Sequence, residues 1–125
     1  MAAVAAVPLV RALTDLELPT DGPELPELPQ LALMGDGGGT LVGELSAAAS
    51  GADLAYNGST PGPVVRLREG DRVRLGFRNL TDADSSLHLH GLPLTAEVDR
   101  PLVHVAPGGS DTREFVLPPG SAGTY

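Results

Sequence analysis

Two histidines, His88 and His90, are the residues whose type and spacing in this sequence could do chemistry. They stand in the segment Ser86-Leu87-His88-Leu89-His90-Gly91. In an extended segment, residues i and i+2 project from the same face, so both imidazoles could reach one metal ion or two adjacent ions. Imidazole suits zinc, copper, iron and nickel, so the ligand type alone leaves the metal open. The simpler alternative is that this alternating polar pair is the solvent-facing side of a strand.

Other reactive groups are few. The sequence contains no cysteine, which excludes a disulfide, a thiolate metal site and a cysteine nucleophile from this chain. The third histidine, His104, has no motif partner, and we expect it outside the metal site. Asp82-Ala83-Asp84 begins like a calcium loop but lacks the glycine and the terminal glutamate that such a loop needs. The histidine pair is therefore the strongest candidate site.

The elements that must position this pair are expected to be β-strands. From Thr40 onward, apolar stretches of strand length are separated by Asn-Gly, Glu-Gly and Pro-Gly-Gly turns, which is typical of an all-β domain. The clearest strand is 71–79, where Val73, Leu75 and Phe77 alternate with polar residues. Residues 64–68 are predicted to pair with it as a hairpin. Further strands are expected at 41–49, 86–90 and 112–117, with 124–125 as the beginning of another.

The histidine strand is predicted to be fixed by its leucines. Leu87 and Leu89 alternate with the histidines, so they should point into the core and hold both imidazoles on the opposite face. Gly91 would end the strand without a side chain that crowds the site.

The chain is expected to divide into an extended lead-in, residues 1–39, and one partial domain, residues 40–125. Prolines at positions 19, 23, 26 and 29 block both helix and central strand, and only 7–13 is a weak helical candidate. The domain offers five strands and a stub, whereas a β-sandwich has about seven. A sandwich that lacks its last strands is the simplest interpretation.

Charge and hydropathy exclude two classes of partner. The formal net charge is −8 and aromatic residues make up 3% of the chain, so nucleic acid is not expected to bind. No apolar run approaches the roughly 20 residues that a membrane span requires. The apolar opening Met1 to Val10 lacks the preceding basic residues of a signal peptide.

Arginines gather on the predicted ribbon formed by 64–68 and 71–79. We expect this to be a solvated face, with docking of the acidic lead-in or of a neighbouring domain as the alternative. The arginines are Arg66, Arg68, Arg72, Arg74 and Arg78.

Several motifs occur together in a fixed order. They are Tyr56-Asn57-Gly58-Ser59-Thr60-Pro61-Gly62-Pro63, the Glu69-Gly70-Asp71 turn, Asn79 at a strand end, Leu87-His88-Leu89-His90-Gly91, and the ending Pro119-Gly120-Ser121-Ala122-Gly123-Thr124-Tyr125. In order and spacing this series resembles the first cupredoxin domain of multicopper oxidases. The resemblance covers roughly residues 40–125 and implies a cupredoxin-like Greek-key β-sandwich.

The resemblance also implies roles for individual residues. His88 would be a type 2 copper ligand and His90 a ligand of one of the paired type 3 coppers, in the trinuclear cluster that reduces dioxygen to water. Asp99 stands where many family members keep an acidic residue that relays protons. The alternative for Asp99 is a loop carboxylate paired with Arg100.

The sequence also departs from the family pattern. The family continues with an aromatic pair, a second H-x-H motif and a distant H-C-H segment, and none of these is present here. Oxidase activity would therefore need the remaining cupredoxin domains or a complementing chain, together with dioxygen and a small reductant. The alternatives are a non-catalytic copper-binding or structural β-domain, and a cupredoxin-like scaffold that binds no copper. Because relatives are commonly exported, a periplasmic or secreted location is implied.

Overall fold

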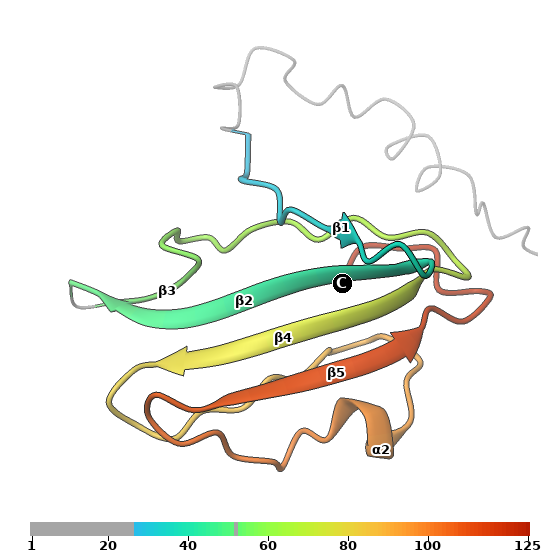
Figure 1. Cartoon of the computed structure of the whole chain (residues 1–125). Helices are drawn as coiled ribbons and strands as arrows, with labels where there is room; N and C mark the ends of the chain where they lie inside the picture. Colours follow the sequence, from blue (N-terminus) through green and yellow to red (C-terminus); the bar gives the residue numbers. More distant parts are fainter. Residues whose placement is uncertain (1–26, 52) are drawn as a thin grey trace, which may run out of the picture.

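The computed structural model describes residues 27–51 and 53–125. Strands dominate this part of the chain, and the helical component is a single turn (Figure 1). The elements are β1 (Met34–Gly35), β2 (Thr40–Ser50), β3 (Asp53–Tyr56), β4 (Arg72–Leu80), α2 (Ala96–Asp99) and β5 (Ser110–Val116). No helix within these residues is long and apolar enough to cross a membrane.

The strands form one open sheet in the order β1-β2-β4-β5, with β3 also paired to β2. β2 and β4 run parallel, from Thr40 opposite Arg72 to Ala48 opposite Leu80, while β4 and β5 run antiparallel. A parallel pair needs a connection that leaves the sheet, and residues 57–71, which follow β3, provide it. The sheet does not close on itself, which confirms the predicted all-β fold with an incomplete sandwich.

The predicted hairpin between 64–68 and 71–79 is wrong. Both edges of β4 are occupied, by β2 on one side and β5 on the other, so no edge remains for residues 64–68. Val64 instead bridges to Gln30. The tight turn between Arg68 and Asp71 does form, because the Asp71 backbone N–H donates to the Arg68 carbonyl oxygen at 3.0 Å.

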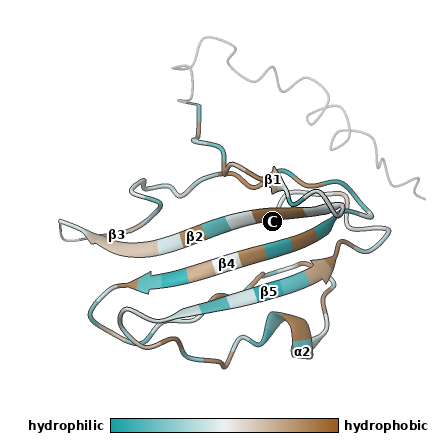
Figure 2. Ribbon diagram, viewed as in Figure 1, coloured by the Kyte–Doolittle hydropathy of each residue, from teal (hydrophilic) through white to brown (hydrophobic). Residues whose placement is uncertain are grey.

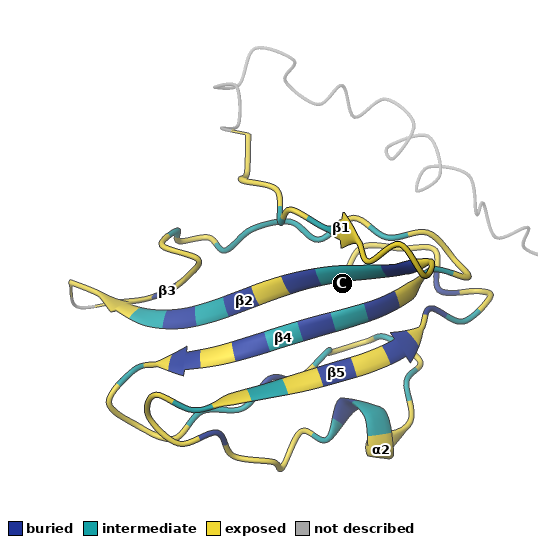
Figure 3. Ribbon diagram, in the orientation of Figure 1, coloured by how far each residue is buried: buried dark blue, intermediate teal, exposed yellow. Residues whose placement is uncertain are grey.

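The core lies on one face of the sheet. Val73, Leu75 and Phe77 alternate along β4 with polar residues or glycine, and each is almost fully buried, as predicted. Figure 2 shows this alternation as brown and teal bands along β4, and Figure 3 shows the corresponding alternation of burial. The segment from residue 81 to 109 covers this face and contributes Leu87 and Val105 to the core.

The segment that carries the histidine pair is not the strand predicted at 86–90. Only Ser85 makes a β-bridge, to Val105, and the following residues run without a strand partner. The predicted alternation nevertheless holds, because Leu87 is buried and Leu89 packs against the core while both histidines are exposed. The stub predicted at 124–125 is also not a strand.

The last residues of the lead-in contact the sheet. β1 pairs with β2, and Arg66 Nε donates to Gln30 Oε1 at 3.0 Å. Arg74 Nη1 lies 3.9 Å from a carboxylate oxygen of Asp36. These contacts favour the docking alternative for two of the five arginines. The helix predicted at 7–13 lies outside the described residues, and the division at residue 39 stays a prediction.

Asp36 organises the turn between β1 and β2. Its Oδ1 accepts the backbone N–H groups of Gly38 at 2.8 Å and Thr40 at 3.1 Å. The donors of Thr40 and Gly38 lower the pKa of Asp36 below its ordinary value. The Asp36 carboxylate thus holds the glycine-rich turn that joins the two strands.

Candidate metal centre

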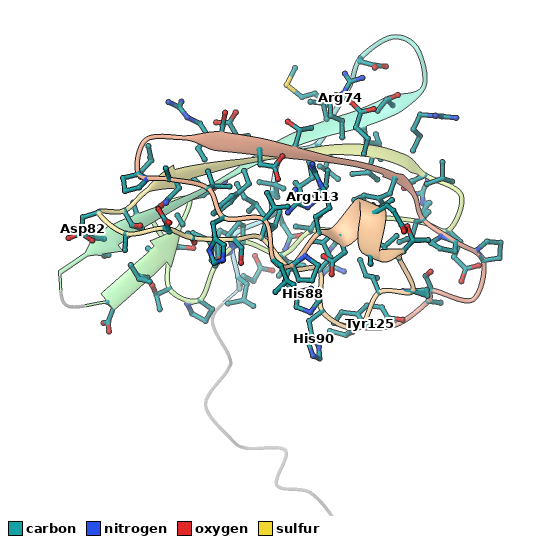
Figure 4. The ribbon with its side chains drawn as sticks, turned by 90° about the horizontal axis from the view of Figure 1, so that it is seen from below. Arg74, Asp82, His88, His90, Arg113 and Tyr125 are labelled. Carbon is teal, nitrogen blue, oxygen red and sulfur yellow. The ribbon has the colours of Figure 1, made fainter. Side chains whose placement is uncertain are left out.

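His88 and His90 lie next to one another on the exposed side of the segment that crosses the core. Their ring centroids are 5.3 Å apart and their planes are nearly perpendicular, at 82°. The His88 side chain is 46% exposed, so its ring is accessible from outside. In Figure 4 both rings project to the side opposite Arg74. The structure therefore brings together the two residues that the sequence singled out.

Asp99, the last residue of α2, reaches this pair from the core. Its carboxylate is largely buried, and one oxygen, Oδ2, is hydrogen-bonded to His88 Nδ1. The other, Oδ1, accepts the backbone N–H of Leu89 at 2.7 Å. The alternative pairing of Asp99 with Arg100 is not seen, because Arg100 Nη2 instead donates to Asp111 Oδ1 at 2.9 Å.

This contact sets the chemistry of the His88 ring. A carboxylate only accepts hydrogen bonds, so the ring nitrogen that faces it carries the proton. In the neutral ring, Nε2 then keeps its lone pair for a cation. Histidines that bind metals almost always donate their other ring N–H to a carboxylate, a carbonyl or water in this way. The arrangement around His88 is thus suited to a metal ligand that binds through Nε2.

Arg113 is the residue of this region that sequence reasoning missed. Its side chain is 1% exposed and lies on the inner face of β5, between the sheet and His88 (Figure 4). Nε donates to the carbonyl oxygen of Asp99 at 2.8 Å, and Nη2 donates to that of Leu87 at 3.2 Å. The alternation along 112–117 was the available signal, since it places Arg113 on the same face as Phe115 and Leu117.

The charge of Arg113 is balanced by Asp111, two residues earlier on β5. Nη1 of Arg113 forms an ion pair with Asp111 Oδ2. Burial raises the pKa of Asp111, but hydrogen bonds from Arg113 and from the Thr112 backbone N–H outweigh it, together with the charges of Arg113 and Arg100. The pKa of Asp111 therefore lies below its ordinary value.

Asn79, at the end of β4, supports the start of the same segment. It is fully buried, and its side-chain amide donates to the carbonyl oxygens of Ala83 at 2.7 Å and Val105 at 2.8 Å. Its Oδ1 accepts the hydroxyl of Thr81 at 2.7 Å. These bonds explain why a buried amide is useful where the chain turns out of the sheet toward the histidines.

The last residues of the chain lie beside the pair. Gly91 has a positive φ of 85°, and a Cβ built on it would lie 2.7 Å from Cδ1 of Tyr125. Figure 4 shows Tyr125 next to His90. Glycine at position 91 thus permits both the left-handed backbone and the close approach of the tyrosine ring.

Two imidazoles do not complete a metal site. In the part of the chain that the structure describes, no group of three His, Cys, Asp or Glu residues is arranged to hold a metal ion. His104 forms no such group with the pair, and its place outside the site stays a prediction. Any further ligands would have to be water or groups from elsewhere.

Comparison with known proteins identifies the family. A family model described as multicopper oxidase matches residues 44–125, more than half of the chain. Copper resistance protein A of Pseudomonas syringae pv. tomato is 38% identical over 76 residues. That match covers 58% of this chain and 12% of the relative. Multicopper oxidase mco of Staphylococcus epidermidis is 36% identical over 70 residues, covering 55% of this chain and 16% of the relative.

Solved structures show the same fold. A multicopper oxidase from Campylobacter jejuni, described as a metallo-oxidase, superposes with a TM-score of 0.71 at 25% identity, over 81% of this chain and 24% of its own. A laccase-like multi-copper oxidase from Ochrobactrum sp. gives a TM-score of 0.60 at 28% identity, over 74% of this chain and 22% of its own. The chain thus spans a quarter or less of these relatives, and it belongs to the multicopper oxidase family with a cupredoxin-like fold.

Proposed function

We propose that this chain contributes copper ligands to the oxygen-reducing trinuclear cluster of a multicopper oxidase. The observation that carries the proposal is the pairing of His88 and His90, with ring centroids 5.3 Å apart and His88 oriented by a buried carboxylate. By family resemblance, His88 would bind the type 2 copper and His90 one of the type 3 coppers.

The residues present fit copper. Neutral imidazole is a good ligand for this metal, and the Asp99 contact leaves Nε2 of His88 available. Both rings are accessible, so a cation could reach them without rearrangement of the core. The remaining ligands would come from other cupredoxin domains or from a complementing chain, because this chain covers 12 to 16% of the two curated relatives compared above.

When bound, copper would supply the one-electron steps that reduce dioxygen to water at the expense of a small reductant. The chain has no cysteine, so a thiolate-bound type 1 copper that accepts electrons from the reductant would lie in another domain. This chain would provide the positions of two ligands rather than the entry point for electrons.

Asp99 and Leu87 of this chain would then keep the histidine ligands in place, and Asp99 would also hold a proton on His88. Asp99 Oδ2 holds the proton of His88 Nδ1, while Oδ1 fixes the backbone at Leu89. A largely buried carboxylate next to the ligand could also pass protons toward oxygen intermediates, the relay role that the family resemblance implies. Leu87, packed in the core, keeps the histidine segment from sliding along the sheet.

Equilibrium dialysis of the full chain against Cu(II) tests the proposal. We expect copper uptake by the wild-type chain, and loss of that uptake in the double variant His88→Ala with His90→Ala. His104→Ala is the matched control, since His104 is exposed and lies outside the pair. Uptake that survives the double substitution would disprove the assignment. A wild-type chain that takes up no copper would favour the purely structural alternative.

A second test addresses the cluster. Mixing or co-expressing the chain with the remaining domains of a relative should restore dioxygen consumption in the presence of copper and a reductant. The double histidine variant should fail to restore it. Restoration by that variant would contradict a role in the cluster.

A further inference from the structure

Arg113 is a charged residue at a buried position of β5 that an apolar residue could also occupy. On the inner face of the sheet it lies opposite Leu75 of β4 and follows the same alternation as Phe115. A buried ion pair is often no more stabilising than well-packed apolar residues of similar volume, because taking the charges out of water is costly. Stability alone therefore does not account for this arginine.

The contacts of the guanidinium converge on the candidate metal centre. Its acceptors are backbone carbonyl oxygens of Leu87, which precedes His88, and of Asp99 and Arg100, at the end of α2. The three distances are 3.2, 2.8 and 3.4 Å. One side chain thus bridges the segment that carries His88 to the segment that carries its carboxylate partner.

The anchor itself is rigid. β5 pairs with β4 over seven consecutive residues, and the Asp111 carboxylate forms an ion pair with the guanidinium. Arginine suits this place because its planar fork donates in several fixed directions, whereas a lysine ammonium is a single point on a flexible stem. Neither the segment that carries His88 nor the end of α2 is part of a strand. The guanidinium donors therefore take the place of the hydrogen bonds that would join neighbouring strands.

We propose that Arg113 is a positioning residue that fixes the His88 segment relative to Asp99, so that the His88 ring keeps its proton on Nδ1 and presents Nε2. The effect on the ring concerns the metal-free chain. Its consequence for copper rests on the proposed function above.

Nitrogen-15 NMR of the imidazole rings in the metal-free full chain tests the positioning role directly, because the two ring nitrogens are distinct and their signals report which of them carries the proton. In the wild-type chain we expect His88 as the Nδ1–H tautomer. Arg113→Met fills the same space without donors, so the His88 signals should shift toward a mixture of tautomers. His104 is an internal reference, and Arg78→Met, on the exposed outer face of β4, is the matched control that should change nothing at His88.

A second variant guards against a loss of folding. Arg113→Lys keeps the charge opposite Asp111 but cannot reach the Leu87 and Asp99 carbonyls together, so it too should loosen the tautomer preference. A His88 ring that stays fully in the Nδ1–H form in either folded variant would overturn the proposal.

Copper binding separates this inference from the function it builds on. If the histidines bind Cu(II), Arg113→Met should lower the affinity about tenfold, the lower end of what the loss of an outer partner costs at metal sites. A wild-type chain that binds no copper but shows the tautomer shift in the variants would refute the proposed function and leave the role of Arg113 standing. Unchanged affinity together with an unchanged ring would refute the role of Arg113 alone.

Discussion

Replacing Asp99 by asparagine should separate orientation of the His88 ring from stability of the fold. The amide oxygen can still accept the Leu89 backbone N–H, which lies 2.7 Å from Oδ1 in the native chain. The amide nitrogen, however, is a donor and would face the donor Nδ1–H of His88. The ring can relieve this conflict by moving its proton to Nε2, the nitrogen that a metal would need.

The expected magnitudes follow from these contacts. The native hydrogen bond to the carboxylate belongs to the charge-assisted class, worth about 1.5 to 3 kcal/mol, and a neutral bond of about 1 kcal/mol would replace it. The loss in unfolding free energy should therefore be about 1 kcal/mol. Loss of an outer partner at a metal site lowers affinity about 10- to 100-fold, which corresponds to about 1.4 to 2.8 kcal/mol.

The assay is Cu(II) competition against a chelator of known affinity, run beside urea unfolding of the same samples. Asp82→Asn is the matched control, because Asp82 is exposed and lies at the end of the molecule away from the pair (Figure 4), where the substitution removes the same charge. Both Asp99→Asn and Asp99→Ala should weaken copper binding, and the alanine variant should also unfold more easily because Leu89 loses its acceptor. Copper affinity in Asp99→Asn equal to that of the control would refute the idea that this carboxylate orients the ring.

Three further outcomes are expected. Because the pKa of Asp111 is lowered in the folded chain, its stabilising contribution is complete above the ordinary value of 3.8 and is lost as the pH falls through the lowered one. The urea midpoint of Asp111→Asn should therefore change less with pH below about pH 4 than that of the wild-type chain. An equally steep fall of the midpoint in the variant would contradict this reasoning. Phe77→Ala should cost about 3 to 5 kcal/mol of unfolding free energy, since this ring is 1% exposed at the centre of the core, and a loss under 1 kcal/mol in urea unfolding would be inconsistent with that position. Gly91→Ala should destabilise more than Gly120→Ala in the same assay, because both have a φ above 80° but only the first would collide with Tyr125, and equal costs would show that the tyrosine contact is unimportant.

Local sequence signals predicted the strands well where burial alternates. β2, β4 and β5 lie within two residues of their predicted limits, because each has one face in the core and one in contact with solvent. The pairing of those strands was not predictable in the same way. The Glu69-Gly70 turn indicated a hairpin, but the partners of β4 come from distant parts of the chain and depend on tertiary packing.

The sequence likewise predicted only part of the candidate site. The spacing of His88 and His90 was sufficient to predict that their rings lie together, because that depends only on an extended backbone. The contact of Asp99 with His88 depends on how α2 packs against β5, and the sequence did not predict it. The two alternatives for Asp99 were a proton-relay acid, implied by the family resemblance, and a loop carboxylate paired with Arg100. Arg113 was overlooked since a charged residue in an alternating segment is easily assigned to solvent, although its position in the pattern places it inside.

The connectivity of β4 has a consequence for how fast the chain folds. Thr40 pairs with Arg72, and Arg78 pairs with Ser110, so each neighbour of the central strand is at least 32 residues away along the chain. The chain must therefore close long loops before the central strand gains either partner, and folds dominated by such distant pairings reach the native state slowly, in milliseconds to seconds. The β1–β2 and β2–β3 pairs, by contrast, join residues that are close in the sequence, so they can form early.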